Sequence, residues 1–172
     1  MELTDTRMIK ASPDMVWAAL LDPEVLMACV PGCTEMSGSV ETGFEATVKQ
    51  KIGPVSATFK GVVQISDVVE GQSCTISGEG KGGAAGFAKG GAKVALTPVD
   101  GGTELSYEVE AKVGGKIAQL GSRIIDGVAR KLADEFFARF QATLEGPETP
   151  DATEDPEETP KKKGWFQRFK AD

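Results

Sequence analysis

The sequence feature that most constrains the fold is a series of apolar residues, three or four positions apart, within residues 116–144. The series consists of Ile117, Leu120, Ile124, Val128, Leu132, Phe136, Phe140 and Leu144. This spacing predicts an amphipathic helix over 116–144 with these side chains on one face. At 1.5 Å per residue such a helix would be about 43 Å long. Because it must bury its apolar face, the rest of the chain has to supply a broad apolar surface.

The segment between residues 33 and 113 has the pattern of an antiparallel sheet. Apolar side chains alternate with polar ones there, as Leu105, Tyr107 and Val109 do with their neighbours, which is typical of half-buried strands. Turn residues such as Gly53–Pro54 and Asp100–Gly102 separate the segments closely enough for hairpins. We expect strands near 44–50, 56–69, 73–79, 92–98 and 103–113.

The N-terminal segment predicts a strand followed by two short helices. Residues 2–10 alternate loosely, and Ser12 with Pro13 suits a helix start, as N-cap and first helical residue. A second short helix is expected through 25–27. Strand, two short helices, meander and long helix is the order of an α+β helix-grip fold, in which a curved antiparallel sheet wraps a long C-terminal helix. Such a sheet leaves space for a cavity, and we assign residues 1–144 to this ligand-binding domain.

The composition excludes several classes of function. The net charge of -7 argues against nucleic-acid binding, and the absence of histidine removes His-based catalysis and the commonest metal ligand. We therefore expect no catalytic residue and no metal site. Cys29, Cys33 and Cys74 are expected to be reduced, because their number is odd and residues 1–5 do not begin a signal peptide. No apolar run approaches the roughly 18 residues of a membrane span, so the chain should stay on the cytoplasmic side.

The C-terminal residues differ from the rest in charge and composition. Residues 145–160 contain seven acidic side chains, no basic ones and four prolines, and are predicted to be a disordered linker. Residues 161–172 carry five basic side chains and three large aromatic ones, which would share one face in a helix, and are predicted to anchor the chain at an anionic membrane surface. A solvated tail or a docking peptide for a protein partner is the alternative. The expected membrane-binding residues are Lys161, Lys162, Lys163, Trp165, Phe166, Arg168, Phe169 and Lys170.

Candidate ligand-binding residues follow from inward periodicity and from nearness to the expected cavity mouth. They are Trp17, Leu20, Phe44, Phe59, Phe87, Tyr107, Leu120, Ile124 and Val128. The glycine-rich run Gly78–Gly91 lacks the context of a phosphate-binding loop. Its glycines would either let a strand bend, or form a mobile lip over the cavity with Phe87 as its apolar tip.

Four segments of the chain carry a family resemblance when they are taken together. They are Cys29–Cys33 (CVPGC), Gly53–Val55 (GPV), Gly82–Gly90 (GGAAGFAKG) and Ala111–Arg123 (AKVGGKIAQLGSR). With them the chain resembles the CoxG family, named for the G subunit of carbon monoxide dehydrogenase, within the START-like, polyketide-cyclase-like (SRPBCC) superfamily. The resemblance covers about residues 1–144.

The resemblance implies a non-enzymatic accessory protein, peripherally attached to the inner face of the cytoplasmic membrane. Its implied partner is a CO dehydrogenase-type molybdenum hydroxylase, which it would recruit there, and its implied ligand is a hydrophobic, lipid-like molecule. Because CO oxidation must pass electrons into a membrane pool, a prenylated quinone such as menaquinone or ubiquinone is expected, and no covalent cofactor. Two alternatives remain open: a pure membrane adaptor without ligand, and a small cavity enzyme of the cyclase type.

Overall fold

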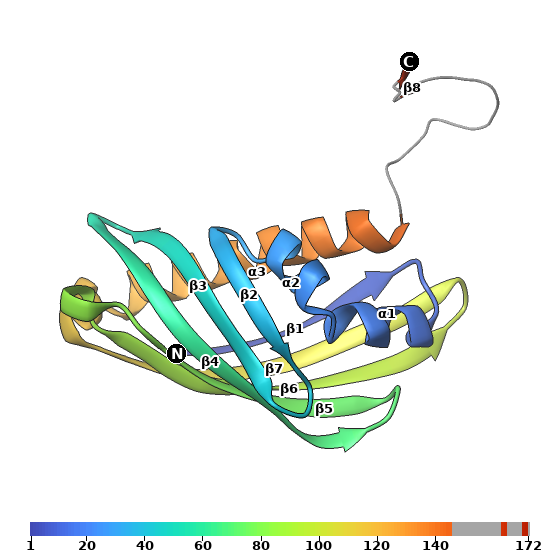
Figure 1. The fold of residues 1–172 in the computed structure, drawn as a ribbon, viewed down its shortest axis with the longest axis horizontal. Coiled ribbons are helices and arrows are strands. Elements are labelled where there is room, and N and C mark those ends of the chain that lie inside the picture. Colours follow the sequence, from blue (N-terminus) through green and yellow to red (C-terminus); the bar gives the residue numbers. More distant parts are fainter. Residues whose placement is uncertain (146–162, 165–169, 172) are drawn as a thin grey trace.

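The five strands predicted between residues 44 and 113, a further strand over 33–39 and the N-terminal strand form one curved sheet. The computed structural model describes residues 1–145, 163–164 and 170–171. Its seven-stranded antiparallel sheet has the order β1-β7-β6-β5-β4-β3-β2 and bends into a trough (Figure 1). The strands are β1 (Glu2–Ile9), β2 (Cys33–Ser39), β3 (Gly43–Ile52), β4 (Val55–Val69), β5 (Ser73–Lys81), β6 (Phe87–Val99) and β7 (Gly102–Gly114). Because β1 pairs with β7, the two edges of the sheet are β1 and β2.

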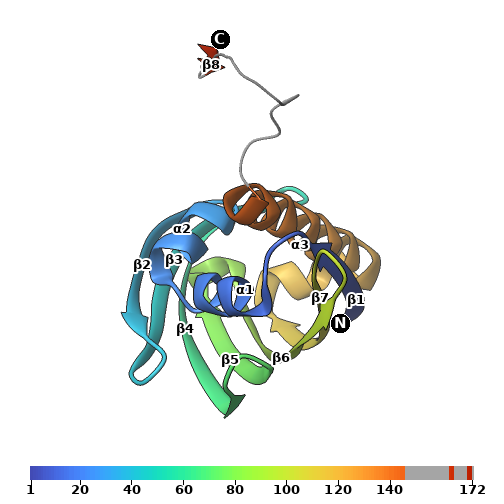
Figure 2. The ribbon, with the colours of Figure 1, turned by 90° about the vertical axis from the view of Figure 1, so that its right-hand side faces the viewer.

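Two short helices, α1 (Pro13–Leu20) and α2 (Pro23–Cys29), follow β1 and both begin with proline. The Ser12 hydroxyl accepts a hydrogen bond from the backbone N–H three residues later at 3.3 Å, and the Asp22 carboxylate accepts one from the N–H two residues later at 2.9 Å. These bonds satisfy amide groups that a helix start leaves unpaired. Helix α1 lies across one end of the trough (Figure 2).

The long helix α3 (Ser122–Glu145) runs along the concave side of the sheet (Figure 1). Phe137 and Phe140 of α3 are buried, and the ring of Phe137 stacks on that of Tyr107 in β7 with centroids 5.2 Å apart. Aromatic pairs at such separations add stability beyond the burial of their surface. The predicted α+β class, with a curved antiparallel sheet around a C-terminal helix, is confirmed.

The long helix begins later than the sequence pattern predicts. Residues Gly115–Leu120 form a separate 3₁₀ helix, η2, and α3 begins at Ser122. Gly121 between them has a φ of 94°, a conformation that glycine adopts readily and that interrupts an α-helix. The prediction of one continuous helix over 116–144 is therefore wrong at its start, because the apolar spacing continues across this break. Another 3₁₀ helix, η1 (Gly83–Ala85), joins β5 to β6.

The described part of the C-terminal tail consists of two short strands. β8 (Lys163–Gly164) pairs antiparallel with β9 (Lys170–Ala171), so these four positions are extended and not helical. The linker 145–160 lies outside the described residues except for Glu145, as do Lys161, Lys162, Trp165, Phe166, Arg168 and Phe169. Both tail assignments stay predictions. Among the described helices, none combines the length and apolar character that crossing a bilayer requires.

A buried hydroxyl ties β7 to the segment after β1, and its removal should destabilise the fold. Thr103 is fully buried and donates a hydrogen bond to the Ala11 carbonyl oxygen at 2.7 Å. Thr103→Val keeps the side-chain shape but removes this donor, so we predict a loss of about 1–3 kcal/mol in the free energy of unfolding. Urea denaturation followed by circular dichroism measures the loss. Thr103→Ser retains the hydroxyl and should lose less; the opposite order would contradict the prediction.

Candidate functional site

The interior of the domain contains a cavity of about 510 Å³ between α3 and the concave face of the sheet. Every strand of the seven-stranded sheet contributes to its wall, together with α1, α2 and α3. The lining residues are Met1, Leu3, Leu20, Leu26, Val30, Pro31, Met36, Phe44, Val48, Gln50, Val63, Ile65, Ile76, Ala92, Val94, Leu105, Tyr107, Val109, Ala129, Leu132, Ala133, Phe136 and Phe137. Ligand pockets typically measure about 300–1,000 Å³ and are mostly apolar. This cavity is therefore the candidate functional site.

Small side chains on both walls keep the cavity open. Ala92 of β6 pairs with Val109 of β7, and strand alternation turns both side chains into the trough. On the facing wall, Ala129 and Ala133 lie one turn apart on α3 and line the same space. Alanine at these positions leaves volume that a larger apolar residue would occupy. Small residues on both walls thus leave space between α3 and the sheet.

Two of the residues that line the cavity, Gln50 and Tyr107, carry polar groups. The Gln50 amide nitrogen donates to the Pro31 carbonyl oxygen at 2.6 Å, which fixes the side chain against the segment after α2. The Tyr107 hydroxyl accepts a hydrogen bond from the Arg7 guanidinium at 3.2 Å. Because that oxygen acts as an acceptor, its own proton remains available for another partner. Both polar groups are thus bonded within the protein, and the surface of the cavity is almost wholly apolar.

Arg7 of β1 connects the edge of the sheet to α3 beside Tyr107. Its Nη2 lies 2.7 Å from Asp134 Oδ1 and 3.4 Å from Asp5 Oδ2, and its guanidinium carbon lies 5.0 Å from the centre of the Phe137 ring. Burial by itself lowers the pKa of Arg7, but hydrogen bonds to Asp134 and Tyr107 outweigh it, so the pKa is raised. The guanidinium therefore stays charged and holds β1 against α3.

Three of the nine candidate ligand-binding residues line the cavity. Leu20 comes from α1, Phe44 from β3 and Tyr107 from β7, and the structure brings all three to one space. Trp17 lies nearby in the core but is not among the lining residues. Its indole N–H donates to Glu70 at 3.0 Å, so that it fastens α1 to the turn between β4 and β5.

The other five candidates do not line the cavity. Phe87 is 41% exposed, because on β6 it has the alternation of the outward-facing residues. Ile124 is 40% exposed at the start of α3, and Leu120 precedes the break at Gly121. Val128 and Phe59 are half-buried outside the lining. Ligand binding at any of the nine residues stays a prediction.

Sequence reasoning missed the part of α3 that faces the cavity. Ala129, Ala133 and Phe137 line it but do not belong to the predicted apolar series, whereas Leu132 and Phe136 do. The lining face is shifted by about one residue from the predicted face. Alanine contributes little to an apolar pattern. Phe137, which directly follows Phe136, is therefore the residue that could have indicated the shifted face.

The glycine-rich run allows close contact between neighbouring strands. A Cβ atom at Gly90 would meet the Glu110 carbonyl oxygen, and one at Gly86 would meet that of Gly114. Gly86 also has a φ of 115°, which disfavours other residues. These contacts support the bending of β6, while the alternative of a mobile lip stays untested; Phe87, its expected tip, lies outside the cavity lining.

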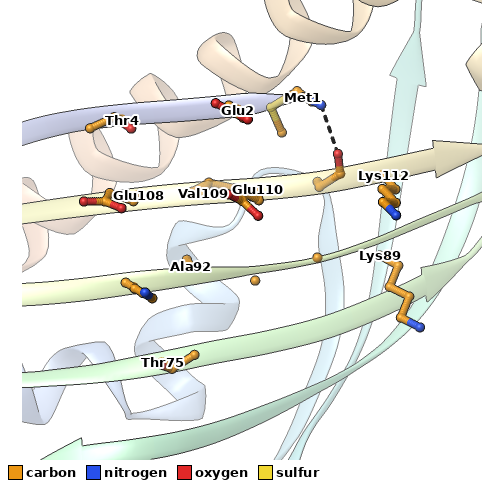
Figure 3. Close-up of a pocket in the computed structure, with 14 residues that line it drawn as sticks. Met1, Glu2, Thr4, Thr75, Lys89, Ala92, Glu108, Val109, Glu110 and Lys112 are labelled. Carbon is orange, nitrogen blue, oxygen red and sulfur yellow. Dashed lines mark hydrogen bonds between the residues drawn. The ribbon is translucent and has the colours of Figure 1, made fainter.

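A second hollow, of about 690 Å³, lies on the outer face of the sheet (Figure 3). Gly90 and Gly91 contribute to its lining, and charged side chains of both signs border it, including Glu108, Glu110 and Lys112. Such a surface suits a hydrated, charged partner more than an apolar ligand. The interior cavity therefore remains the candidate site for an apolar molecule.

The three cysteines are free and form no disulfide. Cys29 and Cys74 are buried and Cys33 is half-buried, with its thiol donating to the Glu35 carbonyl oxygen at 3.2 Å. Burial raises the pKa of all three thiols. Within the described residues no group of three or more Cys, Asp or Glu side chains is arranged to hold a metal ion.

Comparison with known proteins identifies relatives of the whole domain. A family model for CoxG, the G subunit of carbon monoxide dehydrogenase, matches residues 6–145. A conserved protein from Geobacillus kaustophilus is 29% identical with a TM-score of 0.79, over 84% of this chain and 95% of that one. No curated protein matches the chain.

More distant structures share the fold. A START superfamily protein from Mycobacterium smegmatis has a TM-score of 0.62 at 14% identity, over 84% of this chain and 97% of that one. The Aha1 dimer from Colwellia psychrerythraea has a TM-score of 0.55 at 16% identity, over 85% and 97% of the two chains. Likeness at such identities shows the START-like, helix-grip fold alone.

The raised thiol pKa values predict slow and selective modification. Less thiolate is present near neutral pH than in free cysteine, whose pKa is about 8.5, so the thiols should react with Ellman's reagent more slowly than free cysteine does at the same pH. Cys33 should react first in the folded protein, and Cys29 and Cys74 only as it unfolds. Cys33→Ser should remove the early phase; a fast phase that persists in this variant would contradict the assignment.

Proposed function

Because the chain belongs to the CoxG family of carbon monoxide dehydrogenase, we propose that it is a non-enzymatic accessory protein that holds a hydrophobic ligand beside the membrane. In this proposal it recruits a CO dehydrogenase-type molybdenum hydroxylase to the inner face of the cytoplasmic membrane. The START-like fold and the apolar cavity support the ligand-binding part. The family membership supports the choice of partner.

The apolar cavity is the observation that carries the ligand-binding proposal. It measures about 510 Å³, and Gln50 and Tyr107 supply the only amide and hydroxyl groups among the side chains that line it. Transferring an apolar molecule from water to such an interior is favourable by about 25 cal/mol for each Å² of apolar surface buried. A molecule with a long apolar part and few polar atoms therefore fits better than a charged one.

A prenylated quinone is the ligand class that best combines this cavity with the partner. Oxidation of CO with water gives CO₂, two protons and two electrons, and a quinone that takes up all of these electrons and protons becomes a quinol. A quinone has carbonyl oxygens that accept hydrogen bonds, and the Tyr107 hydroxyl has a proton to donate. Its prenyl chain would lie against the apolar wall. Menaquinone and ubiquinone both satisfy these requirements.

The C-terminal tail supports membrane attachment through its composition. Five of its side chains are basic, and Trp165, Phe166 and Phe169 are aromatic. Each cation near an anionic bilayer contributes about 1 kcal/mol, and amphipathic aromatic residues favour the interface. The acidic linker before it would leave the domain free to meet the dehydrogenase while the tail remains on the bilayer.

Filling the cavity should remove the ligand without unfolding the domain. Ala92→Leu adds apolar volume inside the cavity. We therefore predict that the variant, purified from the protein's own host, contains less than half of the bound quinone found in the wild-type protein. Solvent extraction and mass spectrometry measure the occupancy. Ala95→Leu on the same strand places the same change on the exposed outer face and should leave the occupancy unchanged. Wild-type protein with an empty cavity would instead favour a pure adaptor.

Neutralising the tail should weaken membrane binding. In a full-length variant with Lys161, Lys162, Lys163, Arg168 and Lys170 changed to Gln, which we call the tail-neutral variant, affinity for anionic vesicles should fall more than tenfold. Co-sedimentation with vesicles of phosphatidylcholine and phosphatidylglycerol measures this change. Vesicles of phosphatidylcholine alone serve as the control and should bind both proteins weakly. Equal binding of both proteins to anionic vesicles would rule out the tail as an anchor.

A further inference from the structure

Basic side chains gather at the end of the domain that lies opposite α1. This end is formed by the turn between β3 and β4, by η1 and by η2 (Figure 1). Six lysines project there from the outer face of the sheet, namely Lys49, Lys51, Lys60, Lys81, Lys89 and Lys112. Lys116 of η2 and Arg123 of α3 complete the group, and all eight side chains are exposed. We call these eight residues the basic end.

Several of these cations are direct neighbours across strands. The register places Lys60 of β4 opposite Lys81 of β5, and Lys89 of β6 opposite Lys112 of β7. Figure 3 shows Lys89 and Lys112 side by side on the outer face, while Glu108 lies farther along β7. Like charges directly opposite each other destabilise a sheet. The repulsion between Lys60 and Lys81 has no acidic residue opposite to offset it, so an anionic partner would relieve it.

The protein itself compensates this charge only in part: Glu79 is opposite Lys89, but no acidic residue is directly opposite Lys60, Lys81 or Lys112. The salt bridges found within residues 1–145 involve Arg7, and none involves the basic end. Arg123 lies in the first turn of α3, where the helix dipole disfavours a cation and where no acidic residue is present. The electrostatics thus favour an external anionic surface.

Exposed apolar side chains lie among the cations. Phe87 is 41% exposed and Ile124 40%. Phe87 is directly opposite Lys81 in the sheet register, and Ile124 follows Arg123 in α3. Apolar residues beside cations can enter the interfacial layer of a bilayer while the charged groups stay with the headgroups.

The opposite end of the domain is acidic. Asp14, Asp67, Glu70, Asp100, Glu104 and Glu145 lie near α1 or the turns on its side, where Lys10 is the basic residue. The domain therefore has opposite charge at its two ends. An anionic surface would attract the basic end and repel the other, which sets one orientation of the domain.

We propose that the basic end is a second membrane-docking surface, which binds an anionic lipid bilayer through the folded domain itself. The proposal deepens the membrane recruitment proposed above, but rests on residues of the domain and not of the tail. Seven of its eight cations are lysine, a residue depleted at protein–protein interfaces, where arginine is enriched. Lysine-rich clusters are typical of binding to anionic lipid headgroups. Lipid therefore fits this surface better than a protein partner.

Two contacts on one chain would act together on the same bilayer. Once the tail is bound, the basic end meets the membrane at a high effective concentration, so a weak second contact raises the overall affinity. The attraction between exposed charges is screened by salt. Binding through the basic end should therefore be sensitive to ionic strength.

The test compares two sets of four substitutions in the full-length tail-neutral variant. This variant should still bind vesicles of phosphatidylcholine and phosphatidylglycerol in equal parts, in a salt-sensitive way. We call the protein with four further substitutions, Lys60→Gln, Lys81→Gln, Lys89→Gln and Lys112→Gln, the basic-end variant. Its binding to these vesicles should be at least tenfold weaker. The matched control changes Lys10, Lys93, Lys131 and Arg139 to Gln, which removes the same charge elsewhere, and should bind as before.

Two further measurements keep the outcome unambiguous. The melting temperature of the basic-end variant should be unchanged or higher, because opposed lysines are removed, so lost binding would not reflect unfolding. In a chain that carries Trp165→Phe and Phe87→Trp, brominated phospholipid in anionic vesicles should quench the fluorescence of the tryptophan introduced at position 87. Equal vesicle binding by the basic-end variant and its control would overturn the proposal. This conclusion would hold even if the basic-end variant no longer bound the dehydrogenase, because the basic end would then be a protein-binding surface. If the tail-neutral variant bound anionic vesicles as tightly as the wild-type protein, this would refute membrane binding by the tail but not by the basic end.

Discussion

The structure depends on the way α3 packs against the concave face of the sheet along only part of its length. Phe136, Phe137 and Phe140 form a cluster of rings with centroid separations of 5.0 to 6.2 Å, and Tyr107 joins it from β7. Earlier in the helix, alanines replace the aromatic side chains. The aromatic cluster supplies the stability that allows the alanine segment to remain unfilled, so one helix both closes the core and roofs the cavity.

The parts around this contact fix its geometry. Helix α1 closes one end of the trough, fastened by the bond between Trp17 and Glu70, and Arg7 holds the β1 edge to α3 through Asp134. These polar contacts lie at the rim, while the cavity wall stays apolar. The contacts at the rim stabilise the arrangement of α1, α3 and the sheet. The cavity can therefore persist although its empty space provides no packing contacts.

Much of the fold follows from the sequence because its signals are local. Apolar spacing near α3, alternation along Leu105, Tyr107 and Val109, and proline-led short helices each predict the element that the structure contains. The start of α3 was missed because the apolar spacing continues across Gly121, whose positive φ separates η2 from α3. Cavity residues were harder still. An inward alanine such as Ala92 is recognised as part of a cavity only when the position of α3 relative to the sheet is known.

The pairing of β1 with β7 has a consequence for the order of folding. Arg7 meets Asp134 across 127 positions of sequence, and the first strand pairs with the last strand of the sheet. Contacts so distant in sequence form slowly, and none of them can form on the ribosome until nearly the whole domain has been made. The hairpins from β2 to β7 can therefore assemble first, while the apolar concave face of the sheet is still exposed to solvent. A nascent chain at that stage is prone to aggregation, and its concave face is also most accessible to a small apolar molecule.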